Sequence, residues 1–311
     1  MSAPNMRLDH SGAPTVPVGV VVVNYNLPRE TARCVRSVLA GTVRPAAVLV
    51  VDNGSSPEKL DAARREVPAE ILPVGQNAGF AAACNLGIKR LLAGGVEWVW
   101  LLNNDAVVGA ESLEALLTAA EGLPDAGIIS PLIRRLSDGQ VWHQGAVEAA
   151  GPNPLPRNLP ELPPAGAVRV DYVTGCAMLV RRQVFELVGP FDENFFMYYE
   201  ELDFCRRARS SGFGVYVVPA ATVWHEVGAT GRLAAETVRF HRARSRIRYY
   251  RLQAGRPLVL PLVLASTLGW AAGCLVRGDI LGATATVRGI WAGLWADLRP
   301  NYGQWTVPGN W

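Results

Sequence analysis

Apolar runs alternate with amphipathic stretches over the first hundred residues of the chain. Residues 18–23 (VGVVVV) form a continuous apolar run rich in β-branched side chains, which is typical of a strand buried on both faces of a parallel sheet. Three more strands and three helices are expected to follow: strands at 47–51, 71–74 and 98–102, and helices at 28–41, 57–66 and 81–92. Strands that alternate with helices of this length predict a doubly wound α/β sheet.

The second half of the chain is less regular. Residues 136–168 contain many Pro and Gly residues and little periodicity, which predicts a long excursion or lid. Order resumes afterwards, with a strand expected at 173–180, a short helix from 182, an acid-rich helix near 200 and a strand at 215–218. The acid-rich helix carries acids at its start and arginines at its end. This order suits the helix dipole and would stabilise a helix of any function.

Polar residues follow three of the predicted strands at corresponding positions. The three clusters are Asn24-Tyr25-Asn26, Asp52-Asn53-Gly54-Ser55 and Asn103-Asn104-Asp105. A single cluster of this kind is most simply a turn. Because ligands of open α/β sheets bind beyond the carboxyl ends of the strands, three clusters at one edge favour a binding site.

The composition indicates a folded protein and excludes several classes. The chain has 311 residues, of which 50% are hydrophobic and 18% charged, and its net charge is +3, so neither intrinsic disorder nor a nucleic-acid partner is indicated. The five cysteines are scattered and form no CxxC pair, which favours a reducing compartment over a disulfide framework or a zinc site. The first 17 residues are polar and contain no secretory signal, so a cytoplasmic location is expected.

The pattern divides the chain into a polar tail at 1–17, an α/β domain at 18–251 and an apolar, basic extension at 252–311. Within the extension, residues 257–276 carry no charge and are long enough to span a membrane. Residues 280–298 combine Arg288 with Trp side chains, a composition that suits the membrane interface. Attachment to the cytoplasmic membrane face and packing on the α/β domain or a second copy both remain open, with a true span as a third interpretation.

Seven short segments carry a resemblance to a known family: VVVNYN at 21–26, VVDNGSS at 50–56, QNAGFAAACNLGI at 76–88, LLNNDAV at 101–107, TGCAMLVRR at 174–182, GPFDENFFMYYEELDFCRRAR at 189–209 and VWHEVGAT at 223–230. In this order they are similar to the inverting family-two glycosyltransferases of the GT-A fold, especially the bacterial rhamnosyltransferase-like branch. The likeness covers about residues 18–251. It implies a Rossmann-like, mostly parallel sheet flanked by helices, followed here by the apolar helical extension.

The resemblance implies a donor site and a metal site. The donor residues would be Asn24, Asn26 and Asp52 at the nucleoside and Asn77, Gly79 and Asn85 on its ribose and phosphate side, together with Asn103 and Asn104. Asp105 would bind Mg²⁺ or Mn²⁺ at the donor's phosphates, with His225 as a further ligand. The family's DxD motif begins with an acid where this chain has Asn103, which removes one negative charge and implies weaker metal affinity. Without the resemblance, a histidine beside a tryptophan is more simply a packed surface residue.

The acidic motif at 200–203 supplies the predicted catalytic residues. Its second member usually serves as the catalytic base in the family, so Glu201 is the expected general base and Glu200 the alternative. Asp203 lies one turn further into the helix and is expected to orient arginine side chains or the acceptor. A helix N-terminus favours the ionised carboxylate, so the base is expected to be less basic than a buried acid. Inversion would follow from a single in-line displacement with no protein nucleophile.

The function implied by the resemblance is transfer of a sugar from dTDP-rhamnose or a UDP-sugar to a hydroxyl of a glycan or lipid-linked glycan in cell-surface polysaccharide synthesis. One alternative is a nucleotide- or glycan-binding module without turnover, for which Asn103 is the hint. A nucleotidyltransferase should carry a Gly-rich loop with a basic residue after the first strand, and a dinucleotide-dependent oxidoreductase needs GxGxxG at the same turn; the sequence there is Asn24-Tyr25-Asn26. The expected partners are donor and acceptor, with membrane contact or self-association through the extension.

Overall fold

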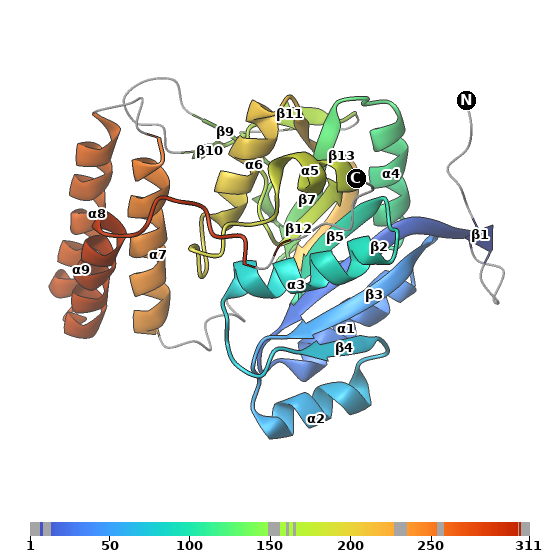
Figure 1. Ribbon diagram of the computed structural model, residues 1–311, viewed down its shortest axis with the longest axis horizontal. Coiled ribbons are helices and arrows are strands. Elements are labelled where there is room, and N and C mark those ends of the chain that lie inside the picture. The colour runs from blue at the N-terminus through green and yellow to red at the C-terminus, as the bar shows by residue number, and fades with distance from the viewer. Residues whose placement is uncertain are drawn as a thin grey trace.

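The computed structural model describes residues 7–8, 14–148, 156–159, 162–163, 166–226, 235–253, 258–303 and 305. A large mixed sheet forms the centre of the molecule (Figure 1). Its main path runs in the order β11 (Val168–Val170), β13 (Gly214–His225), β7 (Ala126–Arg135), β12 (Ala177–Arg181), β5 (Trp98–Asn103), β2 (Pro14–Asn24), β3 (Arg44–Asp52) and β4 (Glu70–Pro73). Shorter strands add to it or pair beside it: β1 (Arg7–Leu8), β6 (Ala106–Val108), β8 (Val141–His143), and the pair β9 (Ala146–Glu148) and β10 (Pro156–Asn158).

The first half of the sheet confirms the predicted alternation of strands and helices. Strands β2, β3, β4 and β5 run parallel, and Asn24 at the end of β2 is the register partner of Asp52 at the end of β3. Asn103 at the end of β5 pairs with Val23. The three polar clusters therefore lie at one edge of the sheet, as expected. The helices that connect these strands are α1 (Pro28–Leu39), α2 (Pro57–Glu66) and α3 (Phe80–Ala93).

The second half of the sheet is mixed: it adds antiparallel strands to the predicted, mostly parallel arrangement. β12 runs antiparallel to both β5 and β7, whereas β13 runs parallel to β7. The backbone N–H of Asn103 donates to the carbonyl of Cys176 at 2.9 Å, so the chain enters β12 from the carboxyl end of β5 and must run against it. The helices of this half are α4 (Ser112–Glu121), α5 (Arg182–Val188) and α6 (Glu200–Ser210).

Several strand boundaries differ from the prediction. β2 begins at Pro14, within the segment predicted as a polar tail at 1–17, rather than at residue 18. The strand expected at 173–180 begins only at Ala177, and the strand expected at 215–218 continues through an irregularity after Val218 to His225. His225 is thus the last residue of β13 rather than a residue beyond the strand. The reason is that β6 pairs with this end of β13, with Ala106 opposite His225.

Helices cover both faces of the sheet, which explains the continuous apolar runs. Along β2, Val20 and Val22 belong to a hydrophobic cluster with α1 and α4, whereas Val21 faces a second cluster with α3, α5 and α6. All three valines are fully buried, and each such burial contributes about 1.5–3 kcal/mol. The approach of α3 is close, because a Cβ placed on Gly87 would lie 2.7 Å from Val21 Cγ1.

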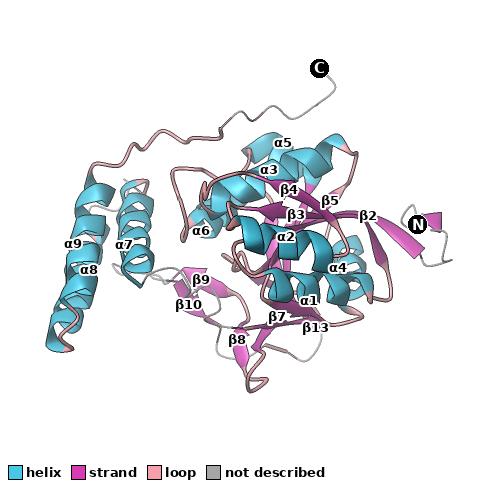
Figure 2. Ribbon diagram, turned by 90° about the horizontal axis from the view of Figure 1, so that it is seen from below, coloured by secondary structure: helices cyan, strands magenta, loops and turns pink. Residues whose placement is uncertain are grey.

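The C-terminal helices α7 (Ala235–Arg251), α8 (Val259–Val276) and α9 (Ile280–Leu294) stand side by side at one end of the sheet (Figures 1 and 2). α9 packs closely on α7, since a Cβ on Gly289 would lie 2.4 Å from the carbonyl oxygen of Phe240. In the described part of the chain, α8 is the one helix long and apolar enough to cross a membrane, with a mean hydropathy of 1.9 and 28% of its 18 residues buried. Pro257, the first residue of the predicted apolar run, lies outside the described residues.

Candidate active site

The carboxyl ends of β2 and β3 carry a buried polar network. The Nδ2 of Asn24 donates to Asp52 Oδ2 at 2.6 Å, and Asn24 Oδ1 accepts from the hydroxyl of Thr31 at 2.8 Å. The hydroxyl of Ser55 donates to Asp52 Oδ2 at 2.7 Å, and the Ser55 N–H donates to the other carboxylate oxygen at 3.1 Å. A carboxylate accepts about four hydrogen bonds, so Asp52 is held in a fixed orientation and keeps capacity to accept one more.

Asn26 joins the loops that follow β2 and β3. Its backbone N–H donates to Ser55 Oγ at 2.8 Å, and its Oδ1 accepts from the N–H of Ser56 at 2.9 Å. Asn26 adopts a left-handed conformation with φ of 57°, which Asn tolerates better than most residues. A cleft of about 390 Å³ between α1 and α2 is bordered by Asn26, a volume within the range of small-molecule sites.

The loop before α3 completes this side of the edge. Asn53 Nδ2 donates to Asn77 Oδ1 at 3.1 Å, and the same oxygen accepts from the N–H of Gly79 at 3.1 Å. A Cβ on Gly79, where φ is 94°, would lie 2.6 Å from the carbonyl oxygen of Phe196, so the position requires glycine. Asn85 lies further along α3, where its Nδ2 donates to the carbonyl of Phe191 at 2.9 Å. The structure therefore places Asn77 and Gly79 beside Asn53, and Asn85 under the loop that begins at Phe191.

Asp105 and His225 meet at the end of β5. Asp105 is 1% exposed, and its Oδ1 lies 3.1 Å from His225 Nε2. Neither carboxylate oxygen accepts a hydrogen bond of regular geometry from the part of the chain that the structure describes. The side-chain nitrogen of Asn103 lies 3.5 Å from His225 Nε2, and Asn104 Nδ2 lies 3.3 Å from the hydroxyl of Thr31.

A buried carboxylate without donors is costly unless a cation lies beside it. Carboxylate oxygen and imidazole nitrogen are ligands that Mn²⁺ accepts, and Mg²⁺ prefers the oxygen. The residues present thus fit a divalent cation at Asp105 and His225. Among the described residues no group of three or more His, Cys, Asp or Glu side chains is placed to hold a metal, so phosphate oxygens and water would have to complete the coordination.

Glu200 and Glu201 begin α6, where Glu200 is 5% exposed and Glu201 is partly buried. Burial raises the pKa of Glu201 to about 7, and burial together with the charge of Glu201 raises the pKa of Glu200 well above its ordinary value. This corrects the expectation that the helix N-terminus keeps the base weakly basic, because the loss of solvation outweighs the nearby backbone N–H groups. The Oε2 atoms of both residues have no hydrogen-bond partner within the described residues.

A short turn joins the acid pair to the end of β5. A Cβ placed on Gly175 would lie 3.8 Å from the Cβ of Glu201. The next residue, Cys176, accepts a hydrogen bond from the backbone N–H of Asn103. The turn at Gly175 and Cys176 therefore contacts both Glu201 and the Asn103 end of β5.

The backbone before α6 is held in an unusual conformation. Tyr198 and Tyr199 both have positive φ, at 67° and 71°, and residues in that region cost about 1–3 kcal/mol each. The loop is fixed from two sides: the hydroxyl of Ser245 on α7 donates to the carbonyl of Met197 at 2.9 Å, and the N–H of Phe80 on α3 donates to the carbonyl of Phe196 at 2.7 Å. The strained loop thus sets the position of Glu200 and Glu201.

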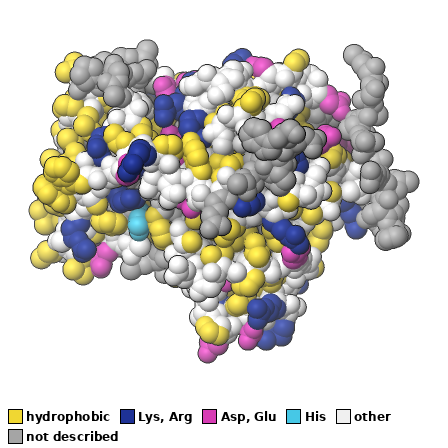
Figure 3. Space-filling model, viewed as in Figure 1, with side chains coloured by type: hydrophobic (Ala, Val, Ile, Leu, Met, Phe, Trp, Pro, Cys, Tyr) yellow, Lys and Arg dark blue, Asp and Glu magenta, His cyan; other side chains and the backbone are white. Residues whose placement is uncertain are grey.

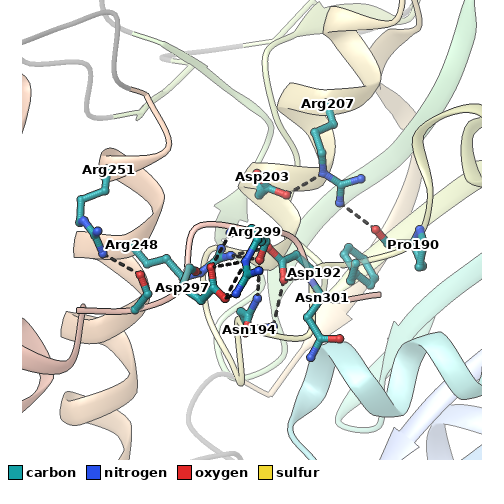
Figure 4. A network of polar contacts seen from close by, with 12 residues as sticks. Pro190, Asp192, Asn194, Asp203, Arg207, Arg248, Arg251, Asp297, Arg299 and Asn301 are labelled. Atoms are coloured by element: carbon teal, nitrogen blue, oxygen red, sulfur yellow. Dashed lines mark hydrogen bonds and ion pairs between the residues drawn. The ribbon is translucent and has the colours of Figure 1, made fainter. Parts of the chain in front are cut away.

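Asp203 lies one turn after the acid pair and serves a different role in the structure (Figure 4). Its carboxylate oxygens accept from Arg206 Nη2 at 3.1 Å and from Arg207 Nε at 2.7 Å. Arg207 also donates to the carbonyl oxygens of Val188 and Pro190, each at 2.8 Å. Asp203 thus orients arginine side chains, one of the two roles considered from the sequence.

Sequence reasoning missed several residues that shape this edge. Thr31 and Ser55 hold Asn24 and Asp52, and only Ser55 belongs to one of the polar clusters. The ring of Trp142 lies 4.7 Å from the imidazole of His225, and no sequence spacing connects these two positions. Trp142 lies within the predicted excursion at 136–168, whose role as a lid stays a prediction.

The mixed α/β sheet, with its three polar loops at one edge and helices on both faces, has the GT-A fold. The chain belongs to the glycosyltransferase-like family 2, whose family model matches residues 14–246. The protein is therefore a glycosyltransferase, and the predicted fold class and family are confirmed.

Two relatives indicate where the chain stands within the family. It is 35% identical over 251 residues to the N-acetylglucosaminyl-diphospho-decaprenol L-rhamnosyltransferase of Mycobacterium tuberculosis, a match that covers 71% of this chain and 80% of that protein. It is 30% identical over 207 residues to the low-salt glycan biosynthesis hexosyltransferase Agl10 of Haloferax volcanii, covering 64% of this chain and 63% of that protein. The predicted rhamnosyltransferase-like character is confirmed by the first of these.

Two solved structures share the fold. A mannosyltransferase from Pyrobaculum calidifontis, in complex with GDP-Man and Mn²⁺, superposes with a TM-score of 0.53 at 16% identity over 94% of this chain and 91% of that chain. GalNAc-T7 with UDP, GalNAc and Mn²⁺ gives a TM-score of 0.54 at 19% identity over 67% of this chain and 42% of that chain. At this identity the likeness establishes the fold.

Proposed function

We propose that the protein transfers a sugar, with inversion, from a nucleoside-diphosphate sugar to a hydroxyl of a lipid-linked glycan in cell-surface polysaccharide synthesis. Two acidic positions carry the proposal: Asp105 beside His225, and the adjacent Glu200 and Glu201. Both Asp105 carboxylate oxygens and the Oε2 atoms of the two glutamates have no hydrogen-bond partner among the described residues. Transfer from such a donor needs a cation site at the diphosphate and a base at the acceptor hydroxyl. A module that only binds nucleotides has no need for a base at the acceptor hydroxyl.

For the donor, we propose dTDP-rhamnose, with UDP-sugars as the alternative. The support is the printed activity of the mycobacterial relative, an L-rhamnosyltransferase. Asp52, fixed by Asn24 and Ser55, would accept the imide N–H that uracil and thymine share. The other residues that we propose for the donor site are Asn26, Asn77, Gly79, Asn85, Asn103 and Asn104.

For the metal, we propose Mg²⁺ or Mn²⁺ held by Asp105 and His225. The two solved neighbours contain Mn²⁺ together with nucleotide ligands. When bound, the cation would neutralise the charge that develops on the leaving diphosphate. Asn103 contributes an amide where the family's motif has a carboxylate, so we expect the affinity for the metal to depend strongly on the donor's phosphate oxygens.

For the chemistry, we propose that Glu201 accepts the proton of the acceptor hydroxyl. A base works best when its pKa lies near the working pH, and burial gives Glu201 a pKa of about 7. The acceptor oxygen attacks the anomeric carbon from the face opposite the diphosphate, which leaves with the bonding electron pair. A single displacement of this kind inverts the anomeric configuration.

For the location, we propose peripheral attachment to the cytoplasmic membrane face through α8 and α9. Hydrophobic side chains gather over these helices, with arginines among them (Figure 3). Trp291 and Trp295 are 64% and 72% exposed and Val276 is 88% exposed, and an apolar surface of this kind marks an interaction site. Self-association through the same surface is the alternative.

A transfer assay tests the proposal. Purified full-length protein receives dTDP-rhamnose, UDP-hexoses or GDP-mannose with a short-chain N-acetylglucosaminyl-diphospho-lipid, in Mg²⁺, Mn²⁺ or EDTA, and product configuration is read by NMR. We expect inverted product with one donor and a metal, loss of product in Asp105→Asn, and no change in the exposed control Asp138→Asn. Donor binding without turnover under every condition would support the binding-module alternative.

A further inference from the structure

A second hollow lies away from the donor edge, between the three C-terminal helices. Its volume is about 340 Å³, and three of its lining residues are arginines: Arg239 and Arg242 on α7 and Arg277 after α8. Arg246 lies on the same face of α7, since positions 239, 242 and 246 follow helical spacing. The guanidinium of Arg246 stacks 4.3 Å from the ring centroid of Trp270, which also lines the hollow.

The positive charge of this hollow is only partly balanced. Arg239 pairs with Asp279 at 2.5 Å. Among the residues that the structure describes, no carboxylate forms an ion pair with Arg242, Arg246 or Arg277.

Arg246 is a buried arginine whose charge is not balanced by a carboxylate. It is 2% exposed, its Nη2 donates to the hydroxyl of Ser266 at 2.8 Å, and its Nε and Nη1 have no partner within the described residues. Burying a guanidinium without a counter-ion is costly. Arg246 does not line the hollow but contacts Trp270, which does, so its charge adds to the positive potential there and favours a ligand that brings negative charge.

Small residues on α8 leave room for such a ligand. Gly269 and Gly273 lie one turn apart on the wall of the hollow. A Cβ on Gly269 would meet no atom within 4 Å, and a Cβ on Gly273 would lie 3.5 Å from Arg277 Nη1. Leu268, beside Gly269, is 50% exposed and belongs to the apolar surface of α8. The hollow thus combines arginines at its wall with an apolar surface beside it.

The hollow is connected to the catalytic base through one side chain. The guanidinium carbon of Arg242 lies 4.9 Å from the ring centroid of Tyr198, and Tyr198 precedes the acid pair Glu200 and Glu201 by two and three residues. Asp105, beside which the donor's phosphates are proposed to bind, does not line the hollow. An anion in the hollow would therefore be held by residues other than those proposed for the donor's phosphates.

We propose that this hollow binds the diphosphate of a lipid-linked acceptor. The inference rests on the proposed function in that it takes the acceptor to be lipid-linked. Two adjacent phosphates match several guanidinium groups, which bind phosphate oxygens by paired, charge-assisted hydrogen bonds. The lipid chain leaves along the exposed apolar side of α8, and the glycan at the other end of the diphosphate extends past Tyr198 towards Glu201.

Binding without turnover tests the proposal. Isothermal titration of the full-length protein in EDTA, without donor, uses farnesyl diphosphate, inorganic diphosphate and farnesol. We expect farnesyl diphosphate to bind most tightly, inorganic diphosphate more weakly, and farnesol not measurably. Each of Arg242→Gln and Arg277→Gln should weaken farnesyl diphosphate about tenfold, which corresponds to about 1.4 kcal/mol, and the matched exposed control Arg288→Gln should not.

A cavity-filling variant keeps the test decisive if the arginine variants fold poorly. Gly269→Leu fills the hollow where the structure leaves free space, and should lower farnesyl diphosphate affinity at least tenfold while the melting temperature and dTDP binding stay as in the wild type. Equal affinity in wild type, Arg242→Gln/Arg277→Gln and Gly269→Leu would overturn the proposal. So would equal loss in Arg288→Gln, which would indicate general charge attraction to an anionic headgroup.

The outcome is separable from that of the proposed function. Arginine-dependent binding together with no transfer in any donor assay would leave the diphosphate site standing and remove the proposed reaction. Transfer that proceeds with the same KM for a diphospho-lipid acceptor in Arg242→Gln/Arg277→Gln as in wild type would retain the reaction and remove the site.

Discussion

Replacing Glu201 by Gln should inactivate the enzyme and stabilise it at the same time. The wild-type carboxyl has an ordinary pKa of 4.5 and a folded-state pKa of about 7. Between these values the folded protein holds a proton that the unfolded chain has lost, so stability falls as pH rises through this window. Above pH 7 the folded state carries a buried charge, which Gln does not have.

The size of the effect follows from the shift. At 1.36 kcal/mol for each pKa unit, a rise from 4.5 to about 7 corresponds to about 3 kcal/mol. About 1–3 kcal/mol is therefore expected for Glu201→Gln at pH 8, because the amide cannot accept all of the backbone hydrogen bonds that the carboxylate accepts. Near pH 4.5 the wild-type carboxyl is largely protonated and similar in shape and charge to the amide, and the difference should nearly vanish.

Urea unfolding of both proteins at pH 8 and pH 4.5 measures this difference, with Glu121→Gln, an exposed position on α4, as the control. Turnover of Glu201→Gln should fall about 10²- to 10⁴-fold with donor affinity retained. In the wild type, kcat should rise tenfold per pH unit up to about pH 7 and then level off. A destabilised Glu201→Gln at pH 8, or full activity at pH 5, would refute this reasoning; inactivity of Glu200→Gln alone would move the base by one residue.

Three further outcomes are expected. Asp105→Ala should abolish metal-dependent transfer while thermal unfolding in EDTA shows no loss of stability, because it removes a buried carboxylate that lacks donors. Arg248→Met should lower unfolding free energy in urea by about 3–5 kcal/mol, because it leaves buried Asp192 without its partner at 2.7 Å; Arg248→Met/Asp192→Asn should recover part of the loss. Trp291→Ser/Trp295→Ser should reduce co-sedimentation with anionic vesicles at least tenfold, and unchanged sedimentation would favour helix packing with another protein.

The regular first half of the sheet could be predicted because its central strands β2 and β5 are buried on both faces. The run at 18–23 has no polar position, since Val20 and Val21 face different clusters that are both closed by helices. Polar clusters follow three of the strands in this half of the sheet. Because parallel strands bring their carboxyl ends together, the clusters indicated the edge of the sheet where we propose that the donor binds. The local pattern of apolar and polar residues was therefore sufficient to predict an element where that pattern follows the burial of its side chains.

The second half depends on contacts between distant segments, which no local pattern reports. His225 reaches Asp105 because β13 pairs with β6, and Trp142 reaches His225 from the irregular excursion. The pKa of Glu201 is also higher than the sequence predicted. The sequence indicates a helix N-terminus at this position, but it does not indicate that the terminus is buried. The face formed by Arg239, Arg242 and Arg246 does have helical spacing, but its partner helix is known only from the structure.

The C-terminal helices contact the loop that precedes Glu201, the proposed base. Arg248 of α7 binds Asp192, Arg244 donates to the carbonyl of Asn194 at 2.7 Å, and Ser245 donates to that of Met197. Asn301, beyond α9, donates its N–H to Asp192 as well, so the chain returns to the same loop (Figure 4). The loop ends in the strained backbone at Tyr198 and Tyr199. Since α7 holds this loop and also lines the arginine hollow, this one helix positions both the proposed acceptor site and Glu201, the proposed base.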